Sequence, residues 1–385
     1  MIYLDNAAST QVADQVLQEM LPYLKENFGN PSSIHKSGRL ATKAIETARK
    51  RIADLIGAKP SEILFTSGGT ESNNTALFGV LDKNKSLVTS SIEHDAILEP
   101  CKKLESQGHK AVYLPVDSFG TVNIEKLKST ITNETGLVSI MYANNEVGTI
   151  QPIREIAQIC KQHQVLLHTD AVQAVGKIPV NVNDLGVDLM SISSHKLHGP
   201  KGIGALYIRS GVHVEPFLLG GGQENGLRSG TENVANIVGF GKACQLAKEN
   251  LEANSAYLKN LRDTLIKNVS HEISHVTVNG HAENRLPNNA HFTFLGVNGE
   301  DLIIKLDENG IAASTGSACS VKTQKASHVL AAMGFAHEQI AGSLRLTVGL
   351  TNTIQEIDAT VLVLKKVVAE LRSVSPFKAK YRFAN

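Results

Sequence analysis

The chain has 385 residues with 38 basic and 37 acidic side chains, which leaves a formal net charge of +1 at pH 7. Because the charges are so evenly balanced, the composition indicates no basic face for nucleic acid or an anionic membrane. No apolar run reaches the length of a bilayer span. A hydrophobic share of 42% with 31 glycines is typical of an α/β enzyme and excludes a disordered or fibrous chain.

The N-terminal part is predicted to be mainly helical. Residues 1–11 are briefly apolar and then polar, and we expect them to cross over and pack against another part of the molecule. Apolar residues at helical spacing predict one helix within residues 12–27 and another at about 40–55, which ends at Gly57.

From residue 63 onward, short apolar runs alternate with longer amphipathic runs. Apolar strands that alternate with helices indicate a parallel sheet covered on both faces. The fold class is therefore α/β, with a mostly parallel seven-stranded sheet flanked by helices. The predicted strands are 63–66, 86–89, 111–115, 137–142, 165–169, 189–193 and 205–208.

The pattern changes near residue 250. Residues 232–269 are typical of one long helix with a bend, and alternating runs at 275–278 and 290–294 follow it before a last helix at 354–372. This predicts a large domain over residues 12–250 and a smaller α+β domain made of residues 1–11 and 251–385.

Four cysteines lie far apart, at positions 101, 160, 244 and 319, and form no CxxC pair. Such spacing disfavours a disulfide framework or a zinc ribbon and favours a reducing compartment. The first residues, MIYLDNAAST, lack the basic start and long apolar core of a signal peptide. We therefore expect a cytoplasmic protein.

The segment SISSHKLHGPKGIGALYI contains the first candidate for chemistry. Its apolar run ends at residues 193–196, and a turn broken by glycines follows. Lys196, on this turn among apolar neighbours, is suited to be a Schiff-base nucleophile, although most loop lysines are simply solvated.

Other polar groups follow the other predicted strands, at the edge where α/β sheets bind ligands. A turn with Gly69 and Thr70 opens a helix and suits a phosphate, and Asp170 follows a buried strand. Asn145 lies in an amide-rich turn, and His94 follows the second strand. Each has a structural alternative: a plain turn, a helix N-cap, a shaped loop or a structural histidine.

Taken together, these groups match the needs of pyridoxal phosphate. A lysine forms an imine with this cofactor, a carboxylate keeps its ring nitrogen protonated, and a glycine turn holds its phosphate. The combination predicts pyridoxal 5′-phosphate as the cofactor.

Two residues near the C-terminus add to this set. Cys319 lies among the small residues of STGSACS, on a loop that we expect to be exposed, where a thiol can react. Arg345 lies in the apolar run LRL, which suits bidentate binding of a substrate carboxylate, the alternative being a structural ion pair.

Nine segments, in order along nearly the whole chain, resemble the NifS-like cysteine desulfurases, a class V group of fold-type I pyridoxal-phosphate enzymes. They are YLDNAAST, GNPSSIH, FTSGGTESNN, EHDAI, NNEVGTIQP, HTDAVQAVGK, SSHKLHGPKGIGALY, GGGQENGLRSGT and STGSACS. The resemblance implies a homodimer that converts L-cysteine to L-alanine. The sulfur would pass as a persulfide on Cys319 to an acceptor or iron–sulfur scaffold protein, for cluster assembly or tRNA thiolation.

The resemblance also implies a role for each catalytic residue. Lys196 would carry the cofactor and move the α-proton, and Cys319 would take the sulfur. Arg345, with Asn145, would bind the cysteine carboxylate. His94 would stack on the cofactor ring. No resident metal is implied, and Cys319 is kept as a candidate transient ligand of an iron–sulfur cluster.

The other cofactor contacts follow from the same resemblance. Asp170 would pair with the ring nitrogen, and Gln173 and Asn145 would contact the phenolic oxygen. The phosphate would be held by Gly69, Thr70, Ser193, His195 and, from the other subunit, Thr231.

The chain departs from the family pattern in three places. It reads GGT where GAT is common, QKASHVL where a proline usually precedes the serine, and Gly349-Leu350 where Gly-Arg is frequent. None removes a catalytic group, but the second could alter how Cys319 moves or which acceptor docks.

The rival functions are a class V aminotransferase, a selenocysteine lyase and a non-catalytic sulfur-assembly scaffold. Cys319 disfavours the aminotransferase, and the intact Lys196, Asp170 and His94 disfavour the scaffold.

Overall fold

All seven predicted strands form one sheet in the computed structural model, which describes residues 1–316 and 326–376. The strand order is β2-β8-β7-β6-β5-β3-β4. The strands are β2 (Ile63–Thr66), β3 (Ser86–Ser90), β4 (Ala111–Leu114), β5 (Thr135–Ser139), β6 (Leu166–Asp170), β7 (Leu189–Ser193) and β8 (Gly204–Ile208).

The sheet is mostly parallel, as predicted, with one exception. Strands β4, β3, β5, β6 and β7 are parallel to one another, whereas β8 is antiparallel to both β7 and β2. Only residues 194–203 connect β7 to β8, which is too short for the crossover that a parallel pair needs. The turn that carries Lys196 therefore reverses the chain direction.

Consecutive residues along the strands pack into two different cores, one on each face of the sheet. Leu64 and Leu87 belong to one core, and their neighbours Phe65 and Val88 belong to the other. Helices α3 (Gly69–Val80) and α4 (Asp95–Ser106) contribute to the first core, and α2 (Lys36–Ile56), α6 (Ile153–Gln162) and α8 (Val234–Glu249) to the second. Both faces are thus covered, as the apolar strands predicted.

The single long helix expected over residues 232–269 is two helices. α8 ends at Glu249 and α9 (Leu251–Glu272) begins two residues later, with Asn250 at φ −118° and ψ 12° between them. The Asn250 side chain donates to the carbonyl of Leu246 at 2.9 Å, which caps the end of α8 and explains the predicted bend.

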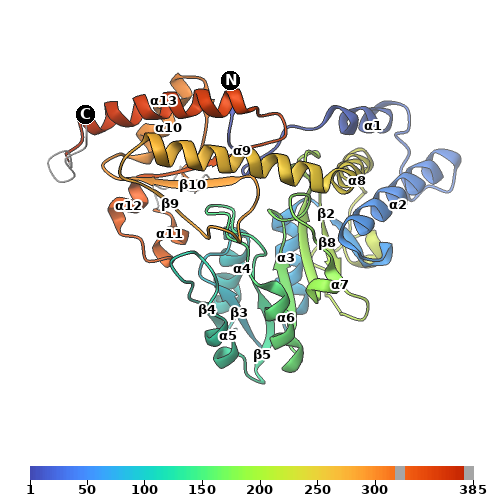
Figure 1. Ribbon diagram of the computed structural model, residues 1–385. Helices are drawn as coiled ribbons and strands as arrows, with labels where there is room; N and C mark the ends of the chain where they lie inside the picture. Colours follow the sequence, from blue (N-terminus) through green and yellow to red (C-terminus); the bar gives the residue numbers. More distant parts are fainter. Residues whose placement is uncertain (317–325, 377–385) are drawn as a thin grey trace.

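A smaller unit stacks on the large one (Figure 1). Its three-stranded antiparallel sheet has the order β12-β10-β9, and helices α9, α10 and α13 cover it. The elements are β9 (Val276–Val278), β10 (Asn289–Phe294), α10 (Gly299–Glu308), β12 (Ser343–Thr347) and α13 (Ile354–Ser373).

The N-terminal residues cross to this smaller unit, as expected. β1 (Ile2–Tyr3) pairs in parallel with β11 (Ile311–Ala312), and Leu4 is fully buried in the core of the smaller unit. Both ends of the described chain lie there (Figure 1). The domain boundaries at residues 11 and 250 stay a prediction.

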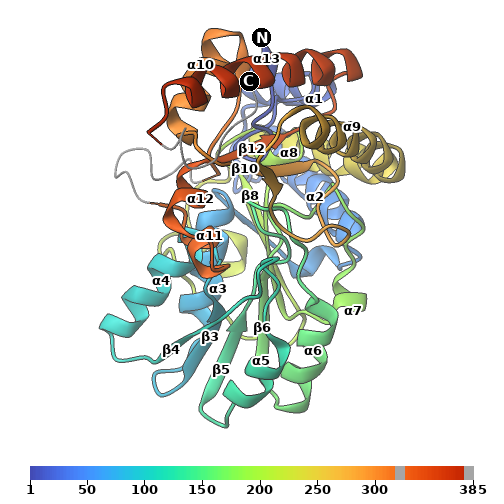
Figure 2. The same cartoon turned by 60° about the vertical axis from the view of Figure 1, so that its left-hand side comes forward.

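The other helices are short or lie at the periphery (Figure 2). In residues 1–316 and 326–376 no helix has the length and apolar character that crossing a bilayer requires. The short or peripheral helices are α1 (Asp14–Lys25), α5 (Ile124–Thr130), α7 (Val182–Leu185), α11 (His328–Ala332) and α12 (His337–Ala341).

A buried histidine in the middle of the sheet makes stability depend on pH. His168 in β6 is fully buried, and its Nδ1 and Nε2 lie 2.8 Å and 3.0 Å from the hydroxyls of Ser139 and Ser191. Burial lowers the pKa of His168 to about 3. Between about pH 6.5 and 3 the unfolded chain therefore binds a proton that the folded protein does not, so stability falls as the pH falls.

We expect His168→Gln to reduce this pH dependence, because glutamine has no group that titrates there. The slope of the unfolding free energy should become shallower by about 1.4 kcal/mol per pH unit below pH 6. Urea unfolding at several pH values measures it, with the exposed His213 replaced by glutamine as the matched control. An unchanged slope in His168→Gln would contradict the prediction.

Candidate active site

The polar residues at the strand ends meet at one edge of the sheet. Asp170 ends β6 and Ser193 ends β7, and these strands are parallel neighbours. At Gly69, in the first turn of α3, an added Cβ would lie 2.8 Å from Val172 Cγ2 and 3.7 Å from Ser193 Cβ. The first turn of α3 thus closely approaches the ends of both strands, and a side chain at position 69 would require Val172 to shift.

The carboxylate of Asp170 is held by two hydrogen bonds and is only 8% exposed. Its Oδ2 accepts from Asn73 Nδ2 at 2.7 Å, and its Oδ1 accepts from the backbone N–H of Val172 at 2.9 Å. Each oxygen can accept more than one hydrogen bond, so Asp170 can still receive a protonated ring nitrogen. Asn73 lies in the FTSGGTESNN segment, but no pattern in that segment predicts that it would orient Asp170.

Lys196 ends the short 3₁₀ turn η2 (Ser194–Lys196) after β7. Its Nζ donates to the backbone carbonyls of Ala7 and Ala8 at 2.6 Å and 2.7 Å. The amine therefore contacts the N-terminal segment, which also binds His195 because Thr10 donates to the His195 carbonyl from its backbone N–H at 2.9 Å.

Gln173 shares one of these carbonyls with Lys196. Its Nε2 donates to the Ala7 carbonyl at 3.0 Å, while its own carbonyl and its Oε1 accept from Lys177 Nζ at 3.0 Å and 3.4 Å. Burial, and then the charge of Lys196, lower the pKa of Lys177 to about 7. Sequence reasoning assigned Gln173 and missed Lys177, which orients the Gln173 amide.

Two histidines that the sequence assigned to the site have defined hydrogen-bond contacts. His94 caps α4, and its Nδ1 accepts from the backbone N–H of Ala96 at 3.0 Å, which places the proton of the neutral ring on Nε2. Burial, and then the nearby lysine charges, lower the pKa of His195 to about 4, so this ring is neutral at pH 7. Its Nδ1 lies 3.3 Å from the Ser9 hydroxyl.

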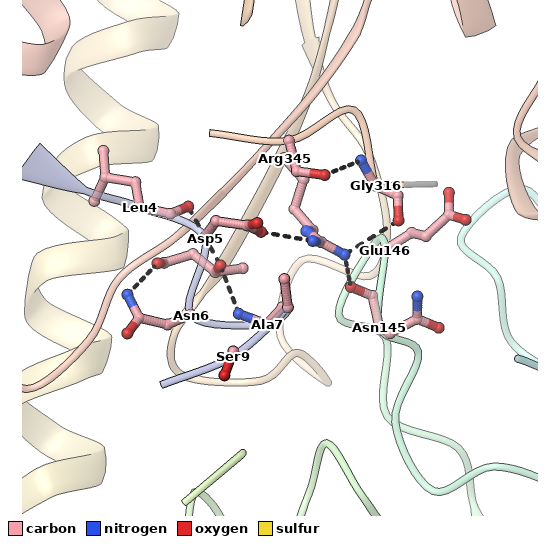
Figure 3. Close-up of polar contacts among 12 residues, drawn as sticks. Leu4, Asp5, Asn6, Ala7, Ser9, Asn145, Glu146, Gly316 and Arg345 are labelled. Carbon is pink, nitrogen blue, oxygen red and sulfur yellow. Dashed lines mark hydrogen bonds and ion pairs between the residues drawn. The ribbon is translucent and has the colours of Figure 1, made fainter. Parts of the chain in front are cut away.

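Arg345 in β12 reaches the site from the smaller unit (Figure 3). Its Nη2 forms an ion pair with Asp5 Oδ1 at 2.7 Å, and its Nη1 donates to the carbonyls of Asn145 and Gly316 at 2.9 Å and 3.2 Å. The arginine side chain is only 3% exposed. Arg345 is thus both next to Asn145 and in an ion pair, and sequence reasoning did not anticipate Asp5 as its partner.

Two of the predicted site residues are not placed with the others. Cys319 lies outside the described residues. Thr231 is exposed and lines a cavity of about 380 Å³ beside α1, to which Lys196, Asp170 and Arg345 do not contribute. The expected role of Thr231 toward the cofactor of the other subunit stays a prediction.

The three cysteines of the described chain are unsuited to nucleophilic chemistry. Cys101, Cys160 and Cys244 are buried. Burial raises the pKa of the first two to about 12 and that of Cys244 as well, so their reactive thiolate forms are suppressed.

The donor set fits pyridoxal phosphate. Asp170 would hold the ring nitrogen, Lys196 would bind the aldehyde carbon, and Gly69, Thr70, Ser193 and His195 would hold the phosphate at the start of α3. Among the described residues, the buried Oδ1 of Asn73, whose Nδ2 donates to Asp170, has no hydrogen-bond partner and is free to meet a polar ligand.

Comparison with known proteins gives a consistent result. The family model Aminotransferase class-V matches residues 2–360. The chain is 51% identical over 385 residues to a protein named cysteine desulfurase IscS from Dictyoglomus turgidum, covering 99% of this chain and 98% of the relative.

Solved structures give the same result. One described as a NifS-like protein is 40% identical with a TM-score of 0.90, covering 96% of this chain and 99% of its own. Another, described as SspA in complex with cysteine, is 37% identical with a TM-score of 0.81, covering 90% and 99%.

Proposed function

The chain belongs to the class-V aminotransferase family and is a pyridoxal-phosphate-dependent cysteine desulfurase; from this premise we propose that Cys319 receives the sulfur as a persulfide. The observation that supports the site best is that Lys196 from the large unit and Arg345 from the smaller unit both contact the N-terminal segment, while Asp170 ends the strand beside β7. These groups suit an amino-acid substrate with one α-amine and one carboxylate.

Each site residue has a different role in the reaction. When bound, pyridoxal phosphate supplies an aldehyde for amines and a ring that withdraws electrons from the substrate α-carbon. Arg345 binds the substrate carboxylate and orients the α-carbon. Asp170 keeps a proton on the ring nitrogen, and the Lys196 amine, once displaced by substrate, takes the α-proton.

Sulfur transfer then needs a thiolate. Cys319 attacks the sulfur of the substrate, an S–S bond forms, and the bond between that sulfur and the substrate β-carbon breaks. The electron pair of this bond stays on carbon, which takes up a proton, so the products are alanine and a persulfide with no external oxidant or reductant. An acceptor protein then removes the outer sulfur, and we propose that it serves iron–sulfur cluster assembly or tRNA thiolation.

We propose a homodimer on the basis of an apolar surface on and beside α1. This surface lies next to the cavity that Thr231 lines, so a second subunit seated there would bring its residues close to Thr231. The large exposed side chains of this region are Leu17, Leu21, Leu24, Phe28 and Ile34. For the compartment we propose the cytoplasm, where the three buried thiols would stay reduced.

The test is turnover of L-cysteine by the purified enzyme with its cofactor. With a reducing thiol present, we expect alanine and sulfide in equal amounts and no need for a 2-oxo acid. Alanine formation that depends on a 2-oxo acid would instead indicate the aminotransferase. A much higher kcat/KM for selenocysteine than for cysteine would indicate the lyase.

A further inference from the structure

The unused hydrogen-bond donors of Arg345 define what its site can bind. A guanidinium has five N–H donors. Nη1 donates to two carbonyls and Nη2 donates once, to Asp5, whereas the buried Nε has no partner among the described residues. Toward the part of the chain that the structure describes, the Nε–H and one Nη2 hydrogen are therefore unused, which is the number that a single bidentate carboxylate takes.

Asp5 is itself fixed in place (Figure 3). On one side of it, the backbone N–H of Thr347 in β12 donates to the Leu4 carbonyl at 2.7 Å. On the other side, the backbone N–H of Ala7 donates to Thr347 Oγ1 at 2.9 Å. Asp5 therefore cannot follow Arg345 if the guanidinium turns, so the ion pair fixes the orientation of the guanidinium.

The same segment links the two ends of the substrate site. Asp5 binds Arg345, and the carbonyls of Ala7 and Ala8 accept from Lys196. The residues that bind the substrate carboxylate and amine in this proposal thus contact positions only two and three apart on one anchored segment.

Glu146, another acid near Arg345, does not offset the charge of the guanidinium. Glu146 is buried, which raises its pKa, and its Oε2 accepts from Ser327 Oγ at 2.5 Å. Asp5 is therefore the carboxylate that offsets the charge of Arg345, so that little positive charge remains for a second substrate carboxylate.

We propose that Asp5 is a positioning residue for substrate selection: it holds Arg345 so that the guanidinium presents donors to one carboxylate, and its charge disfavours dicarboxylic amino acids. This rests on the proposed role of Arg345 in binding the substrate carboxylate. Asp5 acts through Arg345 and has no contact of its own with substrate in this proposal.

The test uses the enzyme with its cofactor, and two amino acids that lack the reacting sulfur. Dissociation constants of L-alanine and L-aspartate are measured from the change in cofactor absorbance, and KM and kcat are measured for L-cysteine. In Asp5→Asn we expect the preference for alanine over aspartate to fall about tenfold and KM to rise about tenfold, with kcat changed by less than about threefold. Asp5→Glu, which keeps the charge, should restore most of the preference.

Three outcomes separate the proposals. An Asp5→Asn enzyme with lower thermal stability but an unchanged alanine preference would show a purely structural role and overturn the inference. So would an Asp5→Glu enzyme no more selective than Asp5→Asn. If Arg345→Gln binds alanine as tightly as the unaltered enzyme, the proposed carboxylate role of Arg345 fails first, and the role of Asp5 falls with it.

Discussion

Lys196→Ala is expected to abolish alanine formation from cysteine and to remove the absorbance band of covalently bound cofactor. Lys196 is proposed both to bind the cofactor and to move the α-proton, and loss of a general base alone costs about 10²–10⁴-fold in rate. The protein should still fold, because Lys196 donates to the backbone carbonyls of Ala7 and Ala8 and belongs to none of the apolar cores.

The matched control is Lys201→Ala, which removes an exposed lysine five positions away on the same turn. Absorbance spectra, and mapping of the cofactor after borohydride reduction, distinguish the two variants: only Lys201→Ala should keep the label on residue 196. Lys177 is the other amine nearby, but it is buried and donates to Gln173. Cofactor found on Lys177 in the unaltered enzyme would refute the assignment of Lys196.

Much of the fold could be predicted from local runs of apolar residues in the sequence. Runs such as 63–66 and 189–193 are mostly apolar, with apolar residues at consecutive positions, so both the strands and the two covered faces could be predicted. The direction of β8 was not predicted, because it depends on the length of the turn after β7 and not on the apolar pattern. The break at Asn250 was foreseen only as a bend, since the helical spacing continues through it.

The site could be predicted where residues follow strands, and not where it depends on distant contacts. Asp170 and Lys196 follow neighbouring strands, so the parallel sheet alone brings them to one edge. The pairing of Asp5 with Arg345 joins positions 340 residues apart, and no spacing rule indicates it. The orientation of Gln173 by Lys177 was missed for another reason: a lysine at helical spacing is usually solvated, and only the packing shows that this one is buried.

Cys319→Ala is expected to stop sulfide release and alanine formation while leaving the cofactor band intact. The other three cysteines are buried with suppressed thiolates, so none of them can replace it. Two described residues on either side of residues 317–325 contact the site: the Gly316 carbonyl accepts from Arg345, and the Ser327 hydroxyl donates to Glu146.

The Cys319→Ala enzyme should still bind cysteine, because Arg345, Lys196 and Asp170 are unchanged. Adding cysteine should therefore shift its cofactor absorbance, without formation of a persulfide that a thiol-reactive probe detects on the protein. Cys101→Ala, which removes a buried thiol, is the matched control and should form the persulfide normally. If Cys319→Ala instead releases sulfide at the rate of the unaltered enzyme, the sulfur does not pass through Cys319, and a small-molecule thiol must attack the substrate sulfur directly.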